Sequence, residues 1–195
     1  MGLRRGAAAD RFGEACSFSE HFLLLMADAQ TWVDRLELES HPEGGYYRET
    51  YRADLSIPEA VLPDRFDGGR DAAALIYFLL PGDSFSAFHR IRQDEAWHFY
   101  AGSPITLHQI APDGTYATTT LGRAIEDGQT LHTVVPAGTW FGATVGDSDR
   151  YALAGCTTAP AFDFADFEMA ERAALIDAYP QHRAVIERLT REEGG

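Results

Sequence analysis

The sequence predicts an all-β domain, an antiparallel sandwich or barrel, with one short helix before it and two after it. Two observations support this prediction. Short apolar or alternating runs follow one another between residues 46 and 159 without helical patterns between them, which is typical of antiparallel rather than βαβ folds. Turn-forming Pro, Gly and Asp residues stand between the runs.

The first part of the chain has no hydrophobic period. Residues 1–25 mix Gly, Ala and charged side chains, so we expect a loose extension there and a single folded domain over residues 26–195. The apolar run at 22–27 is too short to cross a bilayer, and acidic residues rather than a basic segment precede it. We therefore expect a cytoplasmic protein.

Residues 29–38 predict a short amphipathic helix. Trp32, Val33, Leu36 and Leu38 recur close to helical spacing, and Asp28 is a suitable N-cap. The segment His41–Gly45, with its Pro and two Gly residues, is expected to end the helix.

Nine strands are expected after this helix. They are residues 46–53, 73–80, 86–91, 95–102, 105–111, 116–122, 130–135, 139–145 and 151–159. Apolar residues then recur every three or four positions over 164–179 and 180–190, which predicts two short helices packed on the outside of the sheets.

The charge balance excludes several partners. The 195 residues include 16 basic and 30 acidic residues, for a net charge of −14. Such a surface repels nucleic acid and anionic lipid, so we expect neither a nucleic-acid nor a membrane partner. An anionic small molecule is not excluded, because a local Arg or His pocket can oppose the overall sign. The two cysteines, Cys16 and Cys156, form no disulfide or zinc pattern, and Cys156 is interpreted as a buried apolar residue.

The stretch from Gly82 to Gly102 carries the clearest chemical signal. Alternation puts His89 and Ile91 on one face of a strand, and Glu95 and Trp97 on one face of the next. A polar pair among aromatic residues suits a ligand pocket inside a barrel. We therefore take His89 as a candidate general base and Glu95 as its orienting partner or as a ligand contact.

Further residues are candidates for ligand binding. His41 and Glu43 lie in a loop whose glycines have a turn explanation, so a pocket lid, a dimer contact and a capping role stay open for them. Arg90 and Arg92 form either an anion clamp or a salt-bridged surface, and Tyr46, Tyr47, Tyr51, Tyr77 and Tyr100 are candidates for a phenolic acid. The expected ligand-binding set is His41, Glu43, Glu49, Tyr51, Tyr77, Ser86, Arg90, Trp97, Trp140 and Phe141. For Trp140 and Phe141, core packing is the alternative.

Several stretches resemble one known family. The layout around His89 and Glu95 resembles the first cupin motif, and GQTLHTVVPAGTWFG at 128–142 resembles the second. HPEGGYYRETYRA, SAFHRIRQDEAWHFYAG, VVPAGTWFGA and AGCTTAPAFDFADFEMA, in this order, are similar to the DUF985 or cupin 5 family. The resemblance implies a double-stranded β-helix, the cupin jelly roll, commonly a homodimer. It also implies likeness in fold to dTDP-sugar epimerases, and no established reaction.

The usual cupin metal ligands are incomplete here. Ile91 stands where the motif has its second His, and Phe141 where the second motif has its His, so the resemblance leaves only His89 and Glu95. Because a catalytic divalent ion needs three or four ligands, we expect no metal cofactor. Weak divalent binding at His89 and Glu95 stays open, with His132 or His98 as substitutes, although strand parity turns His98 away from Glu95.

Two hypotheses about function follow. The first is a small-molecule-binding cupin that acts as an isomerase or epimerase on a sugar or carbonyl metabolite, with His89 as base. The alternative is a non-catalytic metabolite-binding cupin with a degenerate metal site. Ile91 and Phe141 disfavour a metal-dependent oxygenase.

Overall fold

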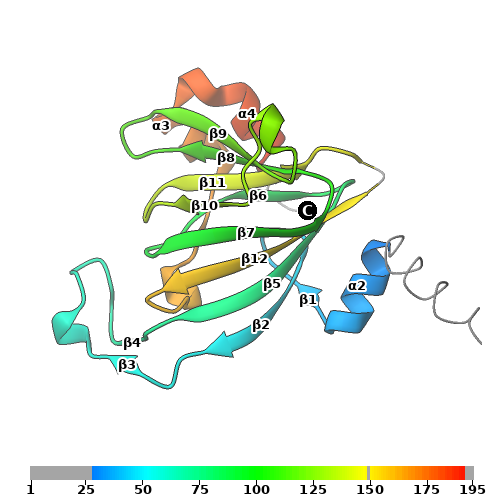
Figure 1. Ribbon diagram of the computed structural model, residues 1–195. Coiled ribbons are helices and arrows are strands. Elements are labelled where there is room, and N and C mark those ends of the chain that lie inside the picture. The colour runs from blue at the N-terminus through cyan, green and yellow to red at the C-terminus, as the bar shows by residue number, and fades with distance from the viewer. Residues whose placement is uncertain (1–27, 149, 192–195) are drawn as a thin grey trace, which may run out of the picture.

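Two antiparallel sheets face each other in the computed structural model, which describes residues 28–148 and 150–191 (Figure 1). The expected extension, residues 1–25, lies outside the described residues. Among the described residues, no helix has the length and apolar character needed to cross a bilayer.

The larger sheet has six strands. In spatial order they are β1 (Glu39–Ser40), β2 (Tyr46–Arg52), β5 (Ala74–Pro81), β12 (Tyr151–Ala159), β7 (Asp94–Gly102) and β10 (His132–Val135). The second sheet has five: β13 (Glu168–Met169), β6 (Phe85–Arg90), β11 (Trp140–Val145), β8 (Ile105–Ile110) and β9 (Tyr116–Leu121). A small ribbon pairs β3 (Ser56–Ile57) with β4 (Arg70–Asp71).

Strands distant in the chain pair with each other, as in a jelly roll. In particular β12 lies between β5 and β7, and β11 between β6 and β8. The nine expected strands are all present, each within two residues of its predicted bounds. The two-residue strands β1, β3, β4 and β13 were not predicted, because two residues carry no alternation to detect.

The core lies between the two sheets. Phe78, Trp97 and Cys156 from the larger sheet pack in one cluster with Leu107 and Phe141 from the smaller one. These side chains alternate with outward-facing residues along each strand, so the interior is continuous over most of the sandwich. A cavity adjoins this cluster at one end of the sandwich, where Phe78, Trp97 and Cys156 also form part of its lining.

The N-terminal helix α2 (Ala29–Leu36) begins as expected. The Asp28 side chain accepts a hydrogen bond from the backbone N–H of Thr31. It ends two residues before the predicted Leu38, because Glu37 adopts a left-handed conformation with φ of 52°. Leu38 is buried against Leu79 and Leu153, so its apolar character serves the packing beneath the helix.

The C-terminal part is only partly helical. The prediction of a helix over 164–179 is wrong in its first half, which forms the short 3-10 turn η3 (Phe164–Asp166) and strand β13. Helix α3 (Arg172–Ala178) begins where the Glu171 side chain caps two backbone N–H groups, and α4 (Arg183–Arg188) follows the turn η4 (Pro180–His182). Both helices cover the outer face of the smaller sheet, as expected, with Phe88, Ile110 and Trp140 in the contact.

Candidate functional site

A cavity of about 460 Å³ opens at the end of the sandwich where β2 and β12 finish and β5 and β7 begin. Its walls come from the larger sheet, from β6, from the loop before β2 and from the segment after β12. The lining residues are Glu39, His41, Glu43, Tyr47, Glu49, Arg52, Ala74, Ile76, Phe78, His89, Ile91, Glu95, Trp97, Cys156, Thr158, Phe162, Asp163, Phe164 and Phe167.

The loop before β2 carries Glu43 into this cavity. Gly44 and Gly45 follow it with φ of 113° and 74°, which other L-residues rarely adopt. A Cβ on Gly45 would lie 2.6 Å from the carbonyl oxygen of Leu79, and one on Gly44 would overlap the carbonyl oxygen of Phe85. The two glycines therefore allow the loop to lie tightly against the neighbouring strands, with the Glu43 carbonyl bonded to the N–H of Ala87.

A bulge in β6 places Ser86 and His89 on the same side. Phe141 pairs with His89 and Ala143 with Ser86, so three steps on β6 face two on β11. The extra residue allows side chains three apart to face the interior together, which a regular strand does not. Both side chains then reach the Glu43 carboxylate.

Glu43 is the centre of a buried polar cluster. Its Oε1 accepts a 2.8 Å hydrogen bond from the Ser86 hydroxyl, and its Oε2 lies 3.0 Å from His89 Nε2 and 3.3 Å from His41 Nδ1. Burial opposes ionisation of this carboxyl, but the attraction it would have for a protonated His89 and the bonds from His41 and Ser86 hold its pKa below the usual range. Glu43 is therefore ionised at neutral pH although it is almost fully buried.

The proton position on His89 is constrained from both sides. Its Nδ1 lies 2.8 Å from the carbonyl oxygen of Ala87, and its Nε2 faces Glu43, so both ring nitrogens face acceptors. Burial lowers the pKa of His89, although the Glu43 carboxylate opposes this effect. A neutral imidazole carries one N–H, so only one of the two oxygens, that of Ala87 or that of Glu43, can receive a hydrogen bond from it. A protonated imidazole carries two N–H groups and can donate to both. This is the property of a poised proton acceptor.

Glu95 has the opposite character. Burial, together with the negative charge of Glu43, raises its pKa to about 8, so that this carboxyl is protonated at neutral pH. The Cys156 thiol and the Trp97 indole partly offset the effect of burial. The indole Nε1 of Trp97 is buried close to the Glu95 carboxyl but forms no hydrogen bond of standard geometry. The cavity thus contains a neutral carboxylic acid with an N–H donor beside it.

An aromatic wall closes one side of the cavity. The His41 ring stacks on Phe164 at 6.1 Å and meets Tyr47 and Phe167 edge-on at 4.7 and 5.7 Å. Phe162 contacts Phe164 at 5.0 Å. The rings come from three separate segments, so the wall exists only in the folded chain.

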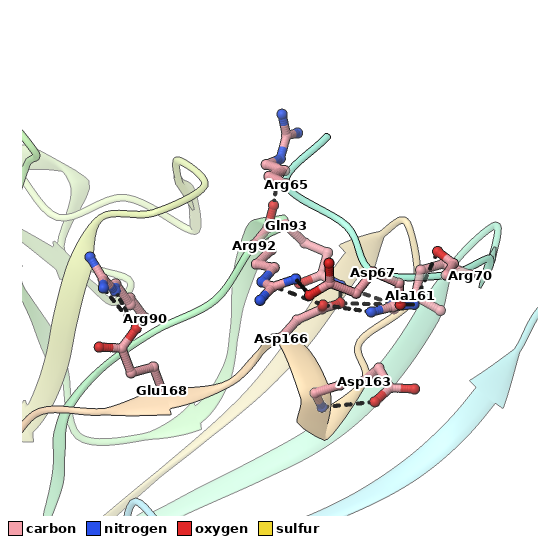
Figure 2. Close-up of polar contacts among 12 residues, drawn as sticks. Arg65, Asp67, Arg70, Arg90, Arg92, Gln93, Ala161, Asp163, Asp166 and Glu168 are labelled. Atoms are coloured by element: carbon pink, nitrogen blue, oxygen red, sulfur yellow. Dashed lines mark hydrogen bonds and ion pairs between the residues drawn. The ribbon is translucent and has the colours of Figure 1, made fainter. Parts of the chain in front are cut away.

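A buried ion pair holds the segment that carries this wall. Asp166 is enclosed by Arg70, which donates bonds of 2.8 and 2.6 Å to its two oxygens, and by Gln93, which donates one of 2.6 Å (Figure 2). Arg92 approaches Asp166 and pairs with Asp67. Because Asp166 lies between Phe164 and Phe167, these bonds fix the position of the aromatic side chains.

The described side chains do not suit a bound metal ion. His41 and His89 both contact the Glu43 carboxylate, and in the described part of the chain no group of three or more His, Cys, Asp or Glu side chains is arranged to hold a metal. His98 points away from the cavity, as expected, and bonds Thr157, while its ring stacks near His132. Phe141 occupies the position at which the second cupin motif has its metal-ligating His. Its ring centroid lies 4.1 Å from that of the His89 ring.

The structure brings together most of the expected polar site residues. His41, Glu43, Glu49, His89, Glu95 and Trp97 line the cavity. Ser86 and Phe141 lie behind it and contact Glu43 and His89. The expected orienting role of Glu95 needs a correction, because Glu43 is the carboxylate that bonds His89.

Four expected ligand-binding residues lie outside the cavity. A bulge between Glu49 and Tyr51 turns Tyr51 outward, where it is 53% exposed. Tyr77 packs on Tyr100 on the outer side of its sheet. Arg90 pairs with Glu168 and covers the Trp140 ring at 4.5 Å, and Trp140 packs under the C-terminal helices. For Arg90 and Arg92 the salt-bridged alternative is the one observed.

Sequence reasoning missed other lining residues. Tyr47 is the member of the five candidate tyrosines that lines the cavity, but its alternation gave no reason to prefer it. Phe162, Phe164 and Phe167 were assigned to a helix or a connection, and Cys156 to simple packing. The cluster of Phe and Asp residues at 162–167 is a signal against a helix, because a helix with this spacing would expose several of its aromatic rings to solvent.

Comparisons with known proteins agree with the fold. Residues 30–170 match the family described as Cupin superfamily (DUF985). Protein SO0799 from Shewanella oneidensis is 39% identical, with a TM-score of 0.77 over 86% of this chain and 100% of its own. A hypothetical protein from Leishmania major is 36% identical, with a TM-score of 0.78 over 85% and 100%.

A more distant structure shares the fold alone. A cupin 2 domain-containing protein from Halorhodospira halophila is 10% identical, with a TM-score of 0.50 over 80% of this chain and 89% of its own. A search of the curated proteins finds no match.

Proposed function

Because the chain belongs to the DUF985 family of the cupin superfamily, we propose that its cavity binds a small carbonyl compound and catalyses proton transfer next to the carbonyl group, as an isomerase or epimerase. One observation carries the proposal. The same cavity holds a neutral acid, Glu95, and an acceptor pair, His89 with Glu43, whose pKa values are shifted by burial and by each other's charge. When the environment shifts the pKa values of two neighbouring carboxyl groups in opposite directions, one group suits the role of acid and the other that of base.

His89 is the proposed proton acceptor. Because both ring nitrogens of His89 face protein oxygens, the proton taken from the carbon next to the carbonyl passes through the Glu43 carboxylate to Nε2 of His89, 3.0 Å away. Both the Ala87 and the Glu43 contacts of the ring then carry a proton. The Glu43 carboxylate then balances the imidazolium charge, and Ser86 holds Glu43 in place. This assigns to Glu43 the orienting role that the sequence had suggested for Glu95.

Glu95 is the proposed proton donor. As the carbon–hydrogen bond breaks, its electron pair forms a carbon–carbon double bond and the carbonyl oxygen takes the proton of Glu95, which gives an enol. The buried N–H of Trp97, which lies beside Glu95, can donate a second bond to the same oxygen. Delivery of a proton to the opposite face of that carbon inverts it, and Glu95 takes its proton back from the enol oxygen. In an α-hydroxy carbonyl compound, delivery of the proton to the former carbonyl carbon, while the α-hydroxyl gives its proton to Glu95, isomerises the compound. Both routes balance without an oxidant.

Tyr47 is the candidate for returning a proton from a second side. It lines the cavity, and burial together with the Glu39 carboxylate raises the pKa of its hydroxyl, which keeps the group protonated. A two-base epimerase needs such a group opposite the first acceptor. A one-base isomerase does not, so the Tyr47→Phe variant separates the two reactions.

Non-catalytic metabolite binding is the second candidate. The buried Trp97 N–H, which forms no hydrogen bond of standard geometry, and the aromatic wall favour ligand binding whether or not chemistry follows. The two candidates differ in one measurable property, which is exchange of a substrate hydrogen with solvent.

The test is deuterium exchange in D₂O. Compounds from a panel of sugars, amino sugars and small keto compounds are first selected by thermal shift, and each binder is then followed by NMR. Proton transfer predicts incorporation of deuterium next to the carbonyl, abolished by His89→Gln and strongly reduced by Glu95→Gln. Binding without exchange would instead support the non-catalytic alternative.

A further inference from the structure

The charges lining the cavity are mostly negative. Glu39, Glu43, Glu49 and Asp163 are acidic, whereas Glu95 is protonated at neutral pH. The fixed positive charge among the described lining residues is Arg52. An anionic ligand entering this site would meet net repulsion.

Arg52 is not free to bind an anion. Its guanidinium donates bonds of 3.0 and 2.7 Å to the Glu49 carboxylate, one of 3.4 Å to Asp71 and one of 3.1 Å to the carbonyl oxygen of Phe162. These contacts occupy the planar fork that would otherwise clamp a phosphate or carboxylate. The arginine therefore organises the cavity mouth.

The aromatic wall favours a cationic ligand. Phe162 and Phe167 are half-buried, Phe164 is 53% exposed, and Tyr47 completes the wall beside the His41 ring. Asp163 stands within this segment and also lines the cavity. Aromatic faces with a carboxylate beside them attract cations that carry alkyl groups or amines.

We propose that the cavity selects a cationic ligand, namely a carbonyl compound that carries a protonated amine, such as an amino sugar. The amine lies against Phe164 and its neighbouring rings near Asp163, and the carbonyl reaches inward to the buried N–H of Trp97 and to Glu95. The carbonyl part rests on the proposed function, whereas the cation part does not. Phosphorylated and nucleotide-linked sugars are excluded as substrates.

Choline and two of its isosteres test the cation directly. 3,3-Dimethylbutan-1-ol is a neutral isostere, and 3,3-dimethylbutanoate carries the same bulky group with a negative charge. Binding to the full chain is followed by NMR shift titration. We expect choline to bind about tenfold more tightly than the neutral isostere, as a desolvated cation–π contact would give, and no binding of the anion. Equal binding of all probes, tighter binding of the anion, or no saturable binding of choline overturns the proposal.

Matched variants locate the binding to this wall. Phe164→Ala is expected to weaken choline binding several-fold, whereas Tyr51→Ala, at an equally exposed ring outside the cavity, leaves it unchanged. Asp163→Asn removes the charge but keeps the oxygen that bonds the Ala165 N–H, and Asp113→Asn is its control, since Asp113 bonds the Thr115 N–H in the same way. The proposal is overturned if the control variants weaken binding as much as the cavity variants do.

The two proposals fail in different ways. Choline has no carbonyl group, so its binding is independent of proton transfer. Choline binding without deuterium exchange in any bound amino carbonyl compound would retain the cation site and contradict the proposed reaction. Deuterium exchange in a neutral sugar, together with no binding of choline to the protein, would support the proposed reaction and contradict the cation site.

Discussion

The Nε2 atom of His89 lies 3.0 Å from Oε2 of Glu43, although 46 positions separate the two residues in the chain. The contact exists because a glycine-dependent loop brings Glu43 to the sandwich and a bulge in β6 turns His89 toward it. It makes Glu43, rather than Glu95, the group that controls the proton on His89. Glu95 is thereby left as a separate, neutral acid.

The Glu43→Gln variant tests this control. Removing the carboxylate charge takes away the attraction that favours the imidazolium, so the pKa of His89 should fall further below its usual value. The pKa of Glu95 should fall as well, because repulsion from Glu43 contributes to its elevation. Both are measured by NMR titration. Glu49→Gln, at the cavity mouth, is the control, and a rise in the pKa of His89 would contradict the account.

The Ser86 hydroxyl should contribute measurably to stability. Ser86→Ala leaves Oε1 of the buried Glu43 without its 2.8 Å donor, so we expect the free energy of unfolding to fall by about 1–3 kcal/mol. Ser56→Ala removes a similar bond of 2.9 Å from Ser56 to Asp71 on the surface and should cost less than about 0.5 kcal/mol. Denaturation curves of both variants provide the comparison, and equal losses would argue against a buried ionised Glu43.

The buried ion pair under the aromatic wall should be costly to break. Asp166→Asn leaves Arg70 with its partner uncharged, and we expect a loss of about 3–5 kcal/mol. Asp67→Asn breaks the exposed pair with Arg92 and should cost less than about 1 kcal/mol. Chemical denaturation measures both. If Asp166→Asn also weakens choline binding, the ion pair positions the wall, whereas unchanged binding would show that the wall holds its place without it.

The raised pKa of Glu95 predicts a pH dependence of stability. The folded state keeps a proton that an unfolded Glu releases near pH 4.5, so the free energy of unfolding should fall as pH rises toward about 8. His108 has its pKa lowered to about 4 by burial and by Arg188, so its effect, a loss of stability on acidification, lies below pH 6.5. The window from pH 6.5 to 8 therefore reports on Glu95.

Glu95→Gln separates this effect from the rest of the chain. The amide is neutral like the protonated acid, so the variant should show a flatter profile between pH 6.5 and 8 and greater relative stability above pH 8. Thermal unfolding in a series of buffers measures it. A variant profile parallel to that of the natural chain would mean that Glu95 is ionised throughout.

Sequence patterns predicted the sheets better than the site. Alternation is a local property, so β5, β6 and β7 and the inward faces of His89, Glu95 and Trp97 could be read directly. The bulges at Tyr51 and beside Ser86 shift the strand-pairing register by one residue. The local alternation of apolar and polar residues does not predict them. They moved Tyr51 outward and brought Ser86 to Glu43.

Tertiary pairing accounts for the remaining differences. Which carboxylate bonds His89 depends on how the loop at Glu43 folds back across the sandwich, and two candidates of equal chemistry were present in the sequence. The predicted helix over 164–179 rests on the spacing of Phe167, Ala170 and Ala174. The buried bonds of Asp166 to Arg70 and Gln93 instead impose a short turn at its start. Long-range polar contacts of this kind override local propensity.

The most direct test of the account is the protonation state of Glu95. Carbon-13 NMR of the Glu95 carboxyl, assigned by comparison with Glu95→Gln, gives its titration midpoint in the intact protein. We expect a midpoint near 8, with a neutral acid at pH 7. A midpoint near 4.5 would contradict it, because an ionised Glu95 cannot donate the proton that the proposed reaction requires.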